Sequence, residues 1–427
     1  MTILRTTIWN GLAVAIRLSA GLVLNKVLAV LVGPGGYAVI GQFQNLVQIT
    51  FTMTAGAINN GITKYTAEFV GHPDAESTLW STAARLIVGA SIVVGVLLIV
   101  ARRPLAVTFL HDASFSGVFI YLALGITLFS LNTMLLAIVN GKKDLRTYVI
   151  SNITGSIVML AMIGTLSWLF GLYGALVAVS LNQAIIFFAT LVLCRRKAWF
   201  DLARFTRPAT RATVRLLFGF ATMAAVSAIA NNGGQVLVRS ILVARFGLTV
   251  AGYWDGMIRI SQINMLLVAT TMSFHFIPRM SELTFWEDIR NEIRAGARLI
   301  GPLFAAGAVV AWALRGLVVR TLYTAQFAPM EQLFAWQFAG DTLRVFSWFM
   351  AYVMIGRAMI LTYVATEILT NAAFVALAWV FVRDVGFTGV AIAHFVTYAI
   401  ATPAMYVAVR HHPGLRYRRS GAGGAVS

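Results

Sequence analysis

Roughly a dozen long apolar stretches run along this chain, and several of them hold an ionisable residue near their middle. Hydrophobic residues make up 59% of the 427 residues, whereas charged residues make up only 11%. Because a helix needs roughly 20 apolar residues to cross a bilayer, about twelve such helices would nearly exhaust the chain. The composition therefore predicts an all-α integral membrane protein without a sizeable domain outside the membrane.

The heaviest basic stretch divides the predicted helices into two groups of six. It runs from Arg195 to Arg215 and falls between the sixth and seventh helices. This predicts an N-terminal six-helix lobe over residues 1–196, a basic cytoplasmic linker over 197–212, and a C-terminal six-helix lobe with a short basic tail over 213–427. The helices are expected at 8–32, 36–62, 78–100, 115–139, 147–170, 172–194, 213–244, 249–276, 296–319, 330–356, 358–382 and 386–409.

The positive charges predict the orientation of the chain. With the N-terminus in the cytoplasm, 21 of the 33 Lys and Arg residues fall in inside loops and 6 in outside loops. Cytoplasmic loops of membrane proteins carry such an excess, so both termini are predicted to be cytoplasmic. The same rule explains most of the net charge of +18 without a nucleic-acid partner. The linker cations either serve this topology alone or also touch anionic lipid head groups.

The two halves share a glycine pattern. Gly36–Gly41 opens the second predicted helix, and Gly247–Gly252 opens the eighth with the same glycine spacing. A cation precedes each pattern, namely Lys26 in the first half and Arg239 in the second. The pattern favours a parallel internal repeat, an arrangement common in alternating-access transporters whose substrate site lies between the halves.

Motifs for ATP hydrolysis or metal binding are missing from the sequence. It contains no GxxxxGK[ST], HExxH or paired CxxC pattern, and Cys194 is its single cysteine. We therefore expect no cofactor, no metal site and no catalytic residues. Energy for transport is expected from an ion gradient, the substrate gradient or a partner.

Cations outnumber carboxylates inside the predicted helices. Such charges cost several kcal/mol each unless they face a partner, a cavity or a substrate. A cationic excess suits an anionic ligand such as a pyrophosphate or an acidic sugar, whereas an exporter of cationic drugs would favour carboxylates. The cations are Arg17, Lys26, Arg85, Arg239, Arg259 and Arg344, and the carboxylates are Asp255, Asp341 and Glu367.

The substrate-binding candidates are Arg17, Lys26, Arg239, Arg259 and Arg344. Arg17 lies on the order of 14 Å into the first helix, near the midplane, where it either faces substrate or pairs between helices. Lys26 and Arg239 lie roughly 10 Å from the helix ends, so snorkelling is an alternative for both. Arg85 is closer to a helix end and is interpreted as snorkelling.

The carboxylates are candidates for ion coupling or for charge pairs. Asp341 and Arg344 are three residues apart and either pair internally or separate when Arg344 engages an anion. Asp255 and Arg259, four apart, allow a similar pair near the helix end. Glu367 stands alone in its helix and either binds a coupling proton or pairs with a cation across the cavity.

Three uncharged or weakly basic residues are further candidates for the cavity. Asn59 and Asn60 either contact sugar hydroxyls or form hydrogen bonds between helices. His394 either relays protons or is a buried histidine with satisfied hydrogen bonds.

Three segments resemble a known family. Asn25–Leu46, Gly56–Phe69 and Phe327–Val345, with its FAWQ and GD pairs, are similar to Wzx-type flippases of the polysaccharide transport family within the MOP exporter superfamily. The similarity runs along essentially the whole chain and includes in particular the lipid III and O-antigen flippases. Charged residues of that family match Arg17, Lys26, Arg239, Asp341, Arg344 and Glu367.

The resemblance implies a V-shaped fold of two six-helix lobes around a central cationic cavity, in a bacterial inner membrane. It also implies alternating access and a substrate that is an undecaprenyl-pyrophosphate-linked oligosaccharide. The product would serve O-antigen, enterobacterial common antigen or exopolysaccharide synthesis. Coupling to H⁺ or Na⁺ is expected, and a polysaccharide polymerase and chain-length proteins are expected partners.

Two other functions compete with this interpretation. A MATE-like, cation-coupled drug exporter has the same fold but should carry an acidic cavity. A membrane-embedded glycosyltransferase or polymerase should carry a sizeable outside loop, whereas the outside loops here are brief. We therefore expect a transporter and not an enzyme.

Overall fold

In the computed structural model, helices make up most of the part of the chain that it describes. It describes the backbone of residues 3–208, 210–283, 285–357, 359–413 and 415. Side chains are described in the same ranges except at 3–18, 219–224, 267, 269–271, 273–275, 277, 278 and 281. No extended strand occurs in the described part, which confirms the predicted all-α class.

Three long helices are each interrupted by a single glycine with positive φ. The backbone φ is 63° at Gly33, 57° at Gly171 and 82° at Gly247. Glycine suits these points because it has no Cβ to clash in that conformation. The helices are α1 (Ile3–Phe51), α6 (Leu145–Arg195) and α7 (Arg211–Glu282).

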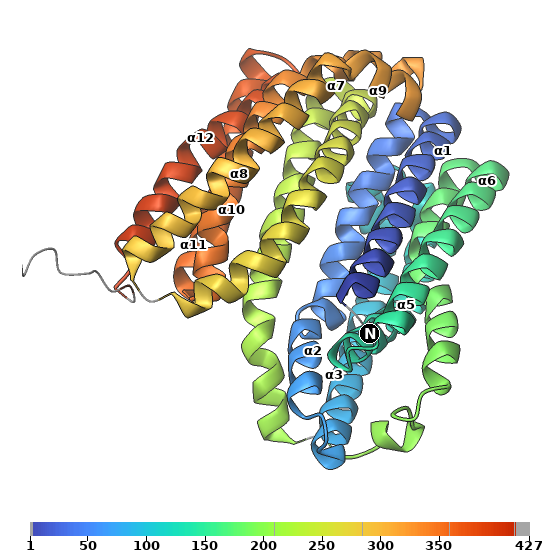
Figure 1. Cartoon of the computed structure of the whole chain (residues 1–427). Coiled ribbons are helices and arrows are strands. Elements are labelled where there is room, and N and C mark those ends of the chain that lie inside the picture. The colour runs from blue at the N-terminus through green and yellow to red at the C-terminus, as the bar shows by residue number, and fades with distance from the viewer. Residues whose placement is uncertain (1–2, 209, 284, 358, 414, 416–427) are drawn as a thin grey trace, which may run out of the picture. The chain divides into compact units, whose positions relative to one another are not determined.

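The interruption in α1 reverses the direction of the chain. Tyr37 Oη donates a hydrogen bond of 2.9 Å to Asn25 Oδ1, twelve residues earlier. Twelve residues of straight helix would separate the two by about 18 Å. The two arms of α1 therefore lie against each other, as Figure 1 shows.

Counting each arm separately, the described helices are consistent with twelve membrane crossings. Eight helical segments are long and apolar enough to span a bilayer, and three of them contain one of these glycines. Counting α10, which carries Asp341 and Arg344, as a further crossing brings the number to twelve. The other long elements are α2 (Asn59–Glu68), α3 (Pro73–Val100), α5 (Val118–Gly141), α8 (Trp286–Ala313), α10 (Phe334–Gly356), α11 (Ile360–Asp384) and α12 (Gly389–Arg410).

Short elements connect these helices. A π-helical turn follows the second arm of α1, so the helix expected at 36–62 is broken and α2 begins at Asn59. The short elements are η1 (Thr52–Gly56), α4 (Arg102–Leu105), η2 (Ala106–Leu110), η3 (Ala113–Gly117), η4 (Leu202–Phe205), α9 (Arg315–Leu322) and η5 (Ala325–Leu333).

The backbone conformation of the turning glycines shifts the alignment of the two halves by three residues relative to the one predicted from the sequence. The first-half residue with the backbone of Gly247 is Gly33, whereas Gly36 stays within helical geometry. The predicted alignment of Gly36 with Gly247 is therefore wrong. Counted from the two turning glycines, Asn25 takes the place of Arg239.

The chain forms two compact units. Unit 1 comprises residues 1–239, 247–252 and 321–326, and unit 2 comprises 240–246, 253–320 and 327–427. In unit 1, α5 packs against α6 and α3, with Trp80 and Ile62 in one core cluster. In unit 2, α12 packs against α10 and α11, over a methionine-rich core that includes Met272 and Met354. The division into lobes at 197–212 stays a prediction.

The basic linker is folded onto unit 1. Lys197 pairs with Asp144 at 2.7 Å, and Arg204 pairs with Glu76 at 3.5 Å. Lys142 also binds Glu76, whose side chain is only 3% exposed. Trp199 and Phe205 lie against Trp80 with ring centroids 5.7 and 5.9 Å away. Acidic and aromatic residues of unit 1 therefore hold this segment in place, in addition to the predicted role of its cations in setting the orientation of the chain.

Candidate functional site

Lys26 lies in a polar cluster of unit 1, beside the turn of α1. Its ammonium group donates a hydrogen bond to the carbonyl oxygen of Tyr323. The Tyr323 hydroxyl lies 3.5 Å from that of Tyr37, which donates to Asn25. Both tyrosines are fully buried, and Lys26 is half-buried. The segment 321–326 thus meets α1 through a cation, two phenols and an amide.

Arg239 is also engaged with α1. Its Nη1 donates a 2.6 Å hydrogen bond to Gln42 Oε1, and both side chains are at most 4% exposed. A buried guanidinium requires acceptors, and this amide supplies one within unit 1. The interpretation of Arg239 as a snorkelling side chain does not fit its burial.

Arg344 has an aromatic environment in unit 2. Its guanidinium lies 5.6 Å from the ring centroids of both Trp348 and Tyr398. Within the described residues it forms no ion pair, and its Nε is buried without a hydrogen-bond partner. Cation–π contacts stabilise such a group but leave its N–H donors available to an anion.

Asp341 pairs with His394, and the alternative pair with Arg344 is not formed. Asp341 Oδ1 lies 3.0 Å from His394 Nε2 and accepts a 3.0 Å hydrogen bond from Gln337 Nε2. Asp341 and Gln337 are fully buried, and His394 is 4% exposed. The histidine thus has a buried carboxylate as its partner.

The remaining charged candidates lie on several helices. Arg17 belongs to α1, but its side chain lies outside the described residues. Asp255 is buried and Arg259 half-buried, both in α7, and Glu367 is half-buried in α11. Each of these three has interaction partners, and their functional roles stay predictions.

Asn59 and Asn60 differ in their surroundings. The side chain of Asn59 is half-buried with an unpaired, buried Oδ1, whereas Asn60 is exposed. Asn60 is therefore directed away from the core of unit 1.

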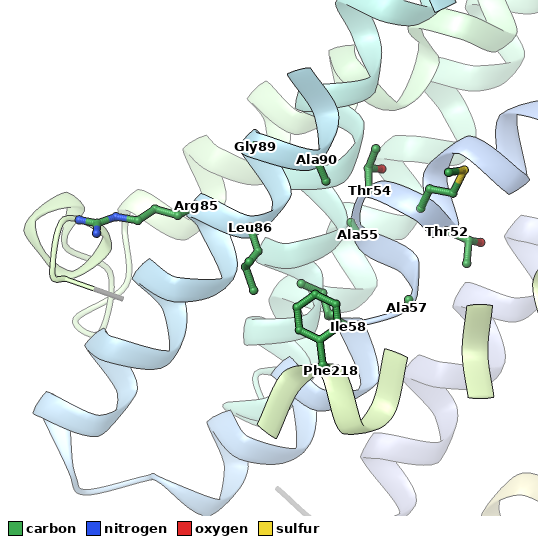
Figure 2. A pocket seen from close by; sticks show the side chains of 11 residues that line it. Thr52, Thr54, Ala55, Ala57, Ile58, Arg85, Leu86, Gly89, Ala90 and Phe218 are labelled. Carbon is green, nitrogen blue, oxygen red and sulfur yellow. The ribbon is translucent and has the colours of Figure 1, made fainter. Parts of the chain in front are cut away.

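A pocket of about 390 Å³ lies beside η1 in unit 1 (Figure 2). Its Thr54 hydroxyl lies 2.7 Å from that of Ser130, and Thr52 donates to a backbone carbonyl. Figure 2 shows Arg85 directed away from the other lining residues, and it donates 2.8 Å to the Thr206 carbonyl. The remaining walls are largely apolar, so this pocket offers few groups to a polar ligand.

A second pocket of about 330 Å³ lies between α1, α5 and both arms of α6. Its lining combines apolar residues with uncharged polar ones, and buried oxygens of Asn132, Ser151 and Asn182 have no hydrogen-bond partner among the described residues. Asn132 Nδ2 donates to Gln183 Oε1 at 3.1 Å. In the sequence, this pocket is marked by amide side chains within apolar helices. A search for charged residues in those helices does not find it.

Several residues beside the candidates were missed by sequence reasoning. Gln337 stands one helical turn before Asp341, a spacing that places both on one face of α10. Tyr398 stands one turn after His394 in the same way. Gln42 contacts Arg239, and Tyr323 contacts Lys26, only through tertiary contacts. No local sequence pattern could therefore predict them.

Comparison with known proteins assigns the family. The family model described as "Polysaccharide biosynthesis protein" matches residues 3–284, about two thirds of the chain. The chain belongs to this family. Two related proteins named lipid III flippase, from Escherichia coli (strain K12) and Shigella flexneri, are 25% identical over 405 residues, covering 94% of this chain and 96% of theirs.

Solved structures support the fold of this member of the polysaccharide biosynthesis family. An inward-facing multidrug resistance MATE family transporter of the MOP superfamily matches with a TM-score of 0.77 and 14% identity, over 93% of this chain and 98% of its own. The lipid II flippase MurJ, in an inward closed conformation, matches with a TM-score of 0.73 and 13% identity, over 96% of this chain and 88% of its own. The chain therefore has the fold of MOP superfamily membrane proteins.

Proposed function

We propose that this protein is a flippase for lipid-linked oligosaccharides. It would move undecaprenyl-pyrophosphate-linked repeat units from the cytoplasmic to the periplasmic leaflet of a bacterial inner membrane, for surface polysaccharide synthesis. Membership in the polysaccharide biosynthesis family and the similarity to lipid III flippases over nearly the whole chain support the substrate class. In this proposal both termini are cytoplasmic, and the halves on either side of 197–212 act as lobes.

The observation that carries the proposal is the guanidinium of Arg344. It lies midway along α10 beside two aromatic rings and forms no ion pair among the described residues, and the carboxylates of Asp341 and Glu367 act on it electrostatically without contacting it. A charge kept at this depth calls for a counter-charge. A diphosphate supplies negative counter-charges, and guanidinium groups bind phosphate oxygens through paired N–H donors. Arg17, Lys26, Arg239 and Arg259 are further candidates for the same role.

The proposed cycle is alternating access with an ion as its driving partner. The diphosphate binds cations, the glycan enters a hydrated cavity and the polyprenyl tail stays in lipid. Asp341, Glu367 and Asp255 are the candidates for coupling to H⁺ or Na⁺. Asn59 and Asn60 are candidates for sugar contacts, and a polymerase and chain-length proteins are candidate partners.

The test is complementation of a strain that lacks the gene for this protein. Labelled lipid-linked sugars should accumulate on the cytoplasmic side in the deletion strain and reach the periplasm when wild-type protein is supplied. Arg344→Ala should restore little transport, because losing a charged hydrogen bond of about 1.5–3 kcal/mol weakens diphosphate binding by roughly 10–150-fold. Arg344→Lys should give an intermediate level.

Arg315→Ala is the matched control. Arg315 also stacks on a tryptophan, Trp312 at 5.1 Å, but lies at the beginning of α9. It should complement like wild type at equal protein levels. Normal transport by Arg344→Ala would contradict the assigned role, and lack of complementation by wild type for any lipid-linked sugar would refute the function.

The second candidate function is export of cationic drugs, which the MATE-like fold favours. Cells that express the protein would then resist cationic antimicrobials in a manner that depends on buried carboxylates. We expect no such resistance.

A further inference from the structure

Three buried polar side chains form a connected cluster in unit 2. Gln337 and Asp341 lie one turn apart on α10, and His394 reaches them from α12. Asp341 Oδ1 accepts from Gln337 Nε2 at 3.0 Å and lies 3.0 Å from His394 Nε2. Their exposed fractions are 0%, 0% and 4%. Such burial separates the cluster from solvent in this conformation.

Two oxygen atoms of this cluster lack a donor. Asp341 Oδ2 and Gln337 Oε1 are buried, and neither has a hydrogen-bond partner among the described residues. Both atoms are acceptors, and they belong to side chains that one hydrogen bond already joins. A protonated Oδ2 would be a donor, whereas the described residues supply no donor to either oxygen. The geometry therefore suits a protonated carboxyl as well as a carboxylate.

His394 offers the same proton a second position. When Nε2 is protonated it donates to Asp341 Oδ1, and when His394 is also protonated on Nδ1 the two form a buried ion pair. The proton held by the two residues can thus rest on either of them.

Charged and titratable groups surround the pair on neighbouring helices. From α12, the Tyr398 ring lies 5.0 Å from the His394 ring, and Arg344 of α10 lies 5.6 Å from the Tyr398 ring. Glu367 of α11 acts electrostatically on Arg344. Helix α8 meets α10 at Phe346, where Gly301 faces the aromatic ring. A change of charge on the pair is therefore felt at Arg344.

We propose that Asp341 and His394 bind one exchangeable proton, with Gln337 as a positioning residue, and that this proton is the coupling ion of the transporter. The link to transport rests on the proposed flippase function. The proton enters from one side of the membrane and leaves to the other, and no bond of the substrate changes. A proton fits better than Na⁺, because Na⁺ takes oxygen ligands and the carboxylate here is shared with an imidazole and an amide N–H.

The first test is proton binding by the purified full chain in lipid nanodiscs. Infrared difference spectra taken across pH should show a carboxylic acid C=O band that is missing from Asp341→Asn and altered in His394→Gln. His411→Gln is the matched control, since His411 is an exposed histidine just beyond α12. Asp341→Glu should keep a band at a changed titration midpoint, which covers the case in which Asp341→Asn does not fold. Wild-type spectra without a band assigned to Asp341 would overturn the proposal.

The second test is transport in proteoliposomes with an imposed pH gradient. For one proton per cycle, the steady-state ratio of lipid-linked sugar between the leaflets should change about tenfold per pH unit in wild type. The ratio should not respond to the gradient in Asp341→Asn or His394→Gln, and it should respond normally in His411→Gln. Transport that ignores the pH gradient overturns the proton proposal and leaves the flippase function intact. Titration of Asp341 without transport of any lipid-linked sugar refutes the flippase function instead.

Discussion

At the scale of single residues, the intramembrane cations differ in how they are accommodated. Arg239 donates to a buried amide, Lys26 to a backbone carbonyl, and Arg344 lies over two aromatic rings. Amides, carbonyls and aromatic rings carry no formal charge, so these contacts do not themselves neutralise the cations. In the proposed function, these cations would bind the anionic head group of the substrate.

Asp144 yields a prediction on pH dependence. It caps α6 outside the membrane-spanning segment and binds Lys197. Partial burial acts to raise the pKa of Asp144, but hydrogen bonds from Lys197 and Thr147 and the charge of Lys197 outweigh it and hold the pKa below its ordinary value of 3.8. A lowered folded-state pKa stabilises the protein above the unfolded-state value, and this stabilisation is lost as pH falls through the folded-state value.

The measurement is thermal unfolding of wild type and Asp144→Asn as a function of pH. Trp80 is fully buried, so intrinsic tryptophan fluorescence reports unfolding over this whole pH range, whereas a thiol-reactive dye at the buried Cys194 reports it near neutral pH. Above about pH 5, the free energy of unfolding of wild type should exceed that of Asp144→Asn by a constant amount. This difference should shrink below about pH 4. A margin that does not depend on pH would contradict the role of the carboxylate charge.

At the scale of elements, Gly33 allows the continuous helix α1 to reverse its direction and form two arms that lie against each other. Gly33 has φ 63° and ψ −177°, a region that is essentially restricted to glycine. Gly33→Ala should therefore destabilise unit 1 by about 1–3 kcal/mol, measured by dye-monitored unfolding. Gly21→Ala lies in the same helix with open space around it and should be neutral or slightly stabilising. Equal stability of the two variants would show that the turn tolerates a Cβ.

Glu76 is the central anchor of the linker. It is buried and binds Lys142 and Arg204, which also lie over the Trp80 ring. Glu76→Gln leaves two cations without their carboxylate and should cost about 3 kcal/mol. Asp74→Asn is the control, because Asp74 is 80% exposed and its pair with Arg207 should contribute below about 1 kcal/mol.

Limited trypsin digestion measures the effect on the linker itself. Cleavage after Lys197 and Arg204 should become faster in Glu76→Gln and stay near the wild-type rate in Asp74→Asn. Unchanged cleavage in both variants would mean that the aromatic contacts with Trp80 hold the linker without the ion pairs.

At the scale of the whole molecule, the distribution of cations predicts which loops face which compartment. In a Cys194→Ala background, the variants Asp201→Cys and His411→Cys should be labelled by a membrane-impermeant thiol reagent only in inverted membranes. Ser114→Cys and Asp384→Cys should be labelled in intact cells stripped of their outer barrier. All four positions are exposed. Labelling of positions 201 and 114 from the same side would contradict the predicted orientation.

The sequence by itself determined the class of the protein. Its apolar runs of roughly 20 residues, in a chain with 59% hydrophobic residues, predict membrane-spanning helices, because a helix satisfies its own backbone groups in lipid. The number of crossings follows from the lengths of the apolar runs. The charged candidates were also visible, because an ionisable residue in an apolar run stands out without any structure.

Only the tertiary structure decided the partners of those charges. Asp341 and Arg344 are close enough along α10 to pair, yet Asp341 is bound by His394, 53 residues later. Lys26 meets Tyr323 across 297 residues of sequence. Local spacing limits which residues can share a helix face, whereas the choice among partners depends on how the helices pack, and packing is a property of the folded chain.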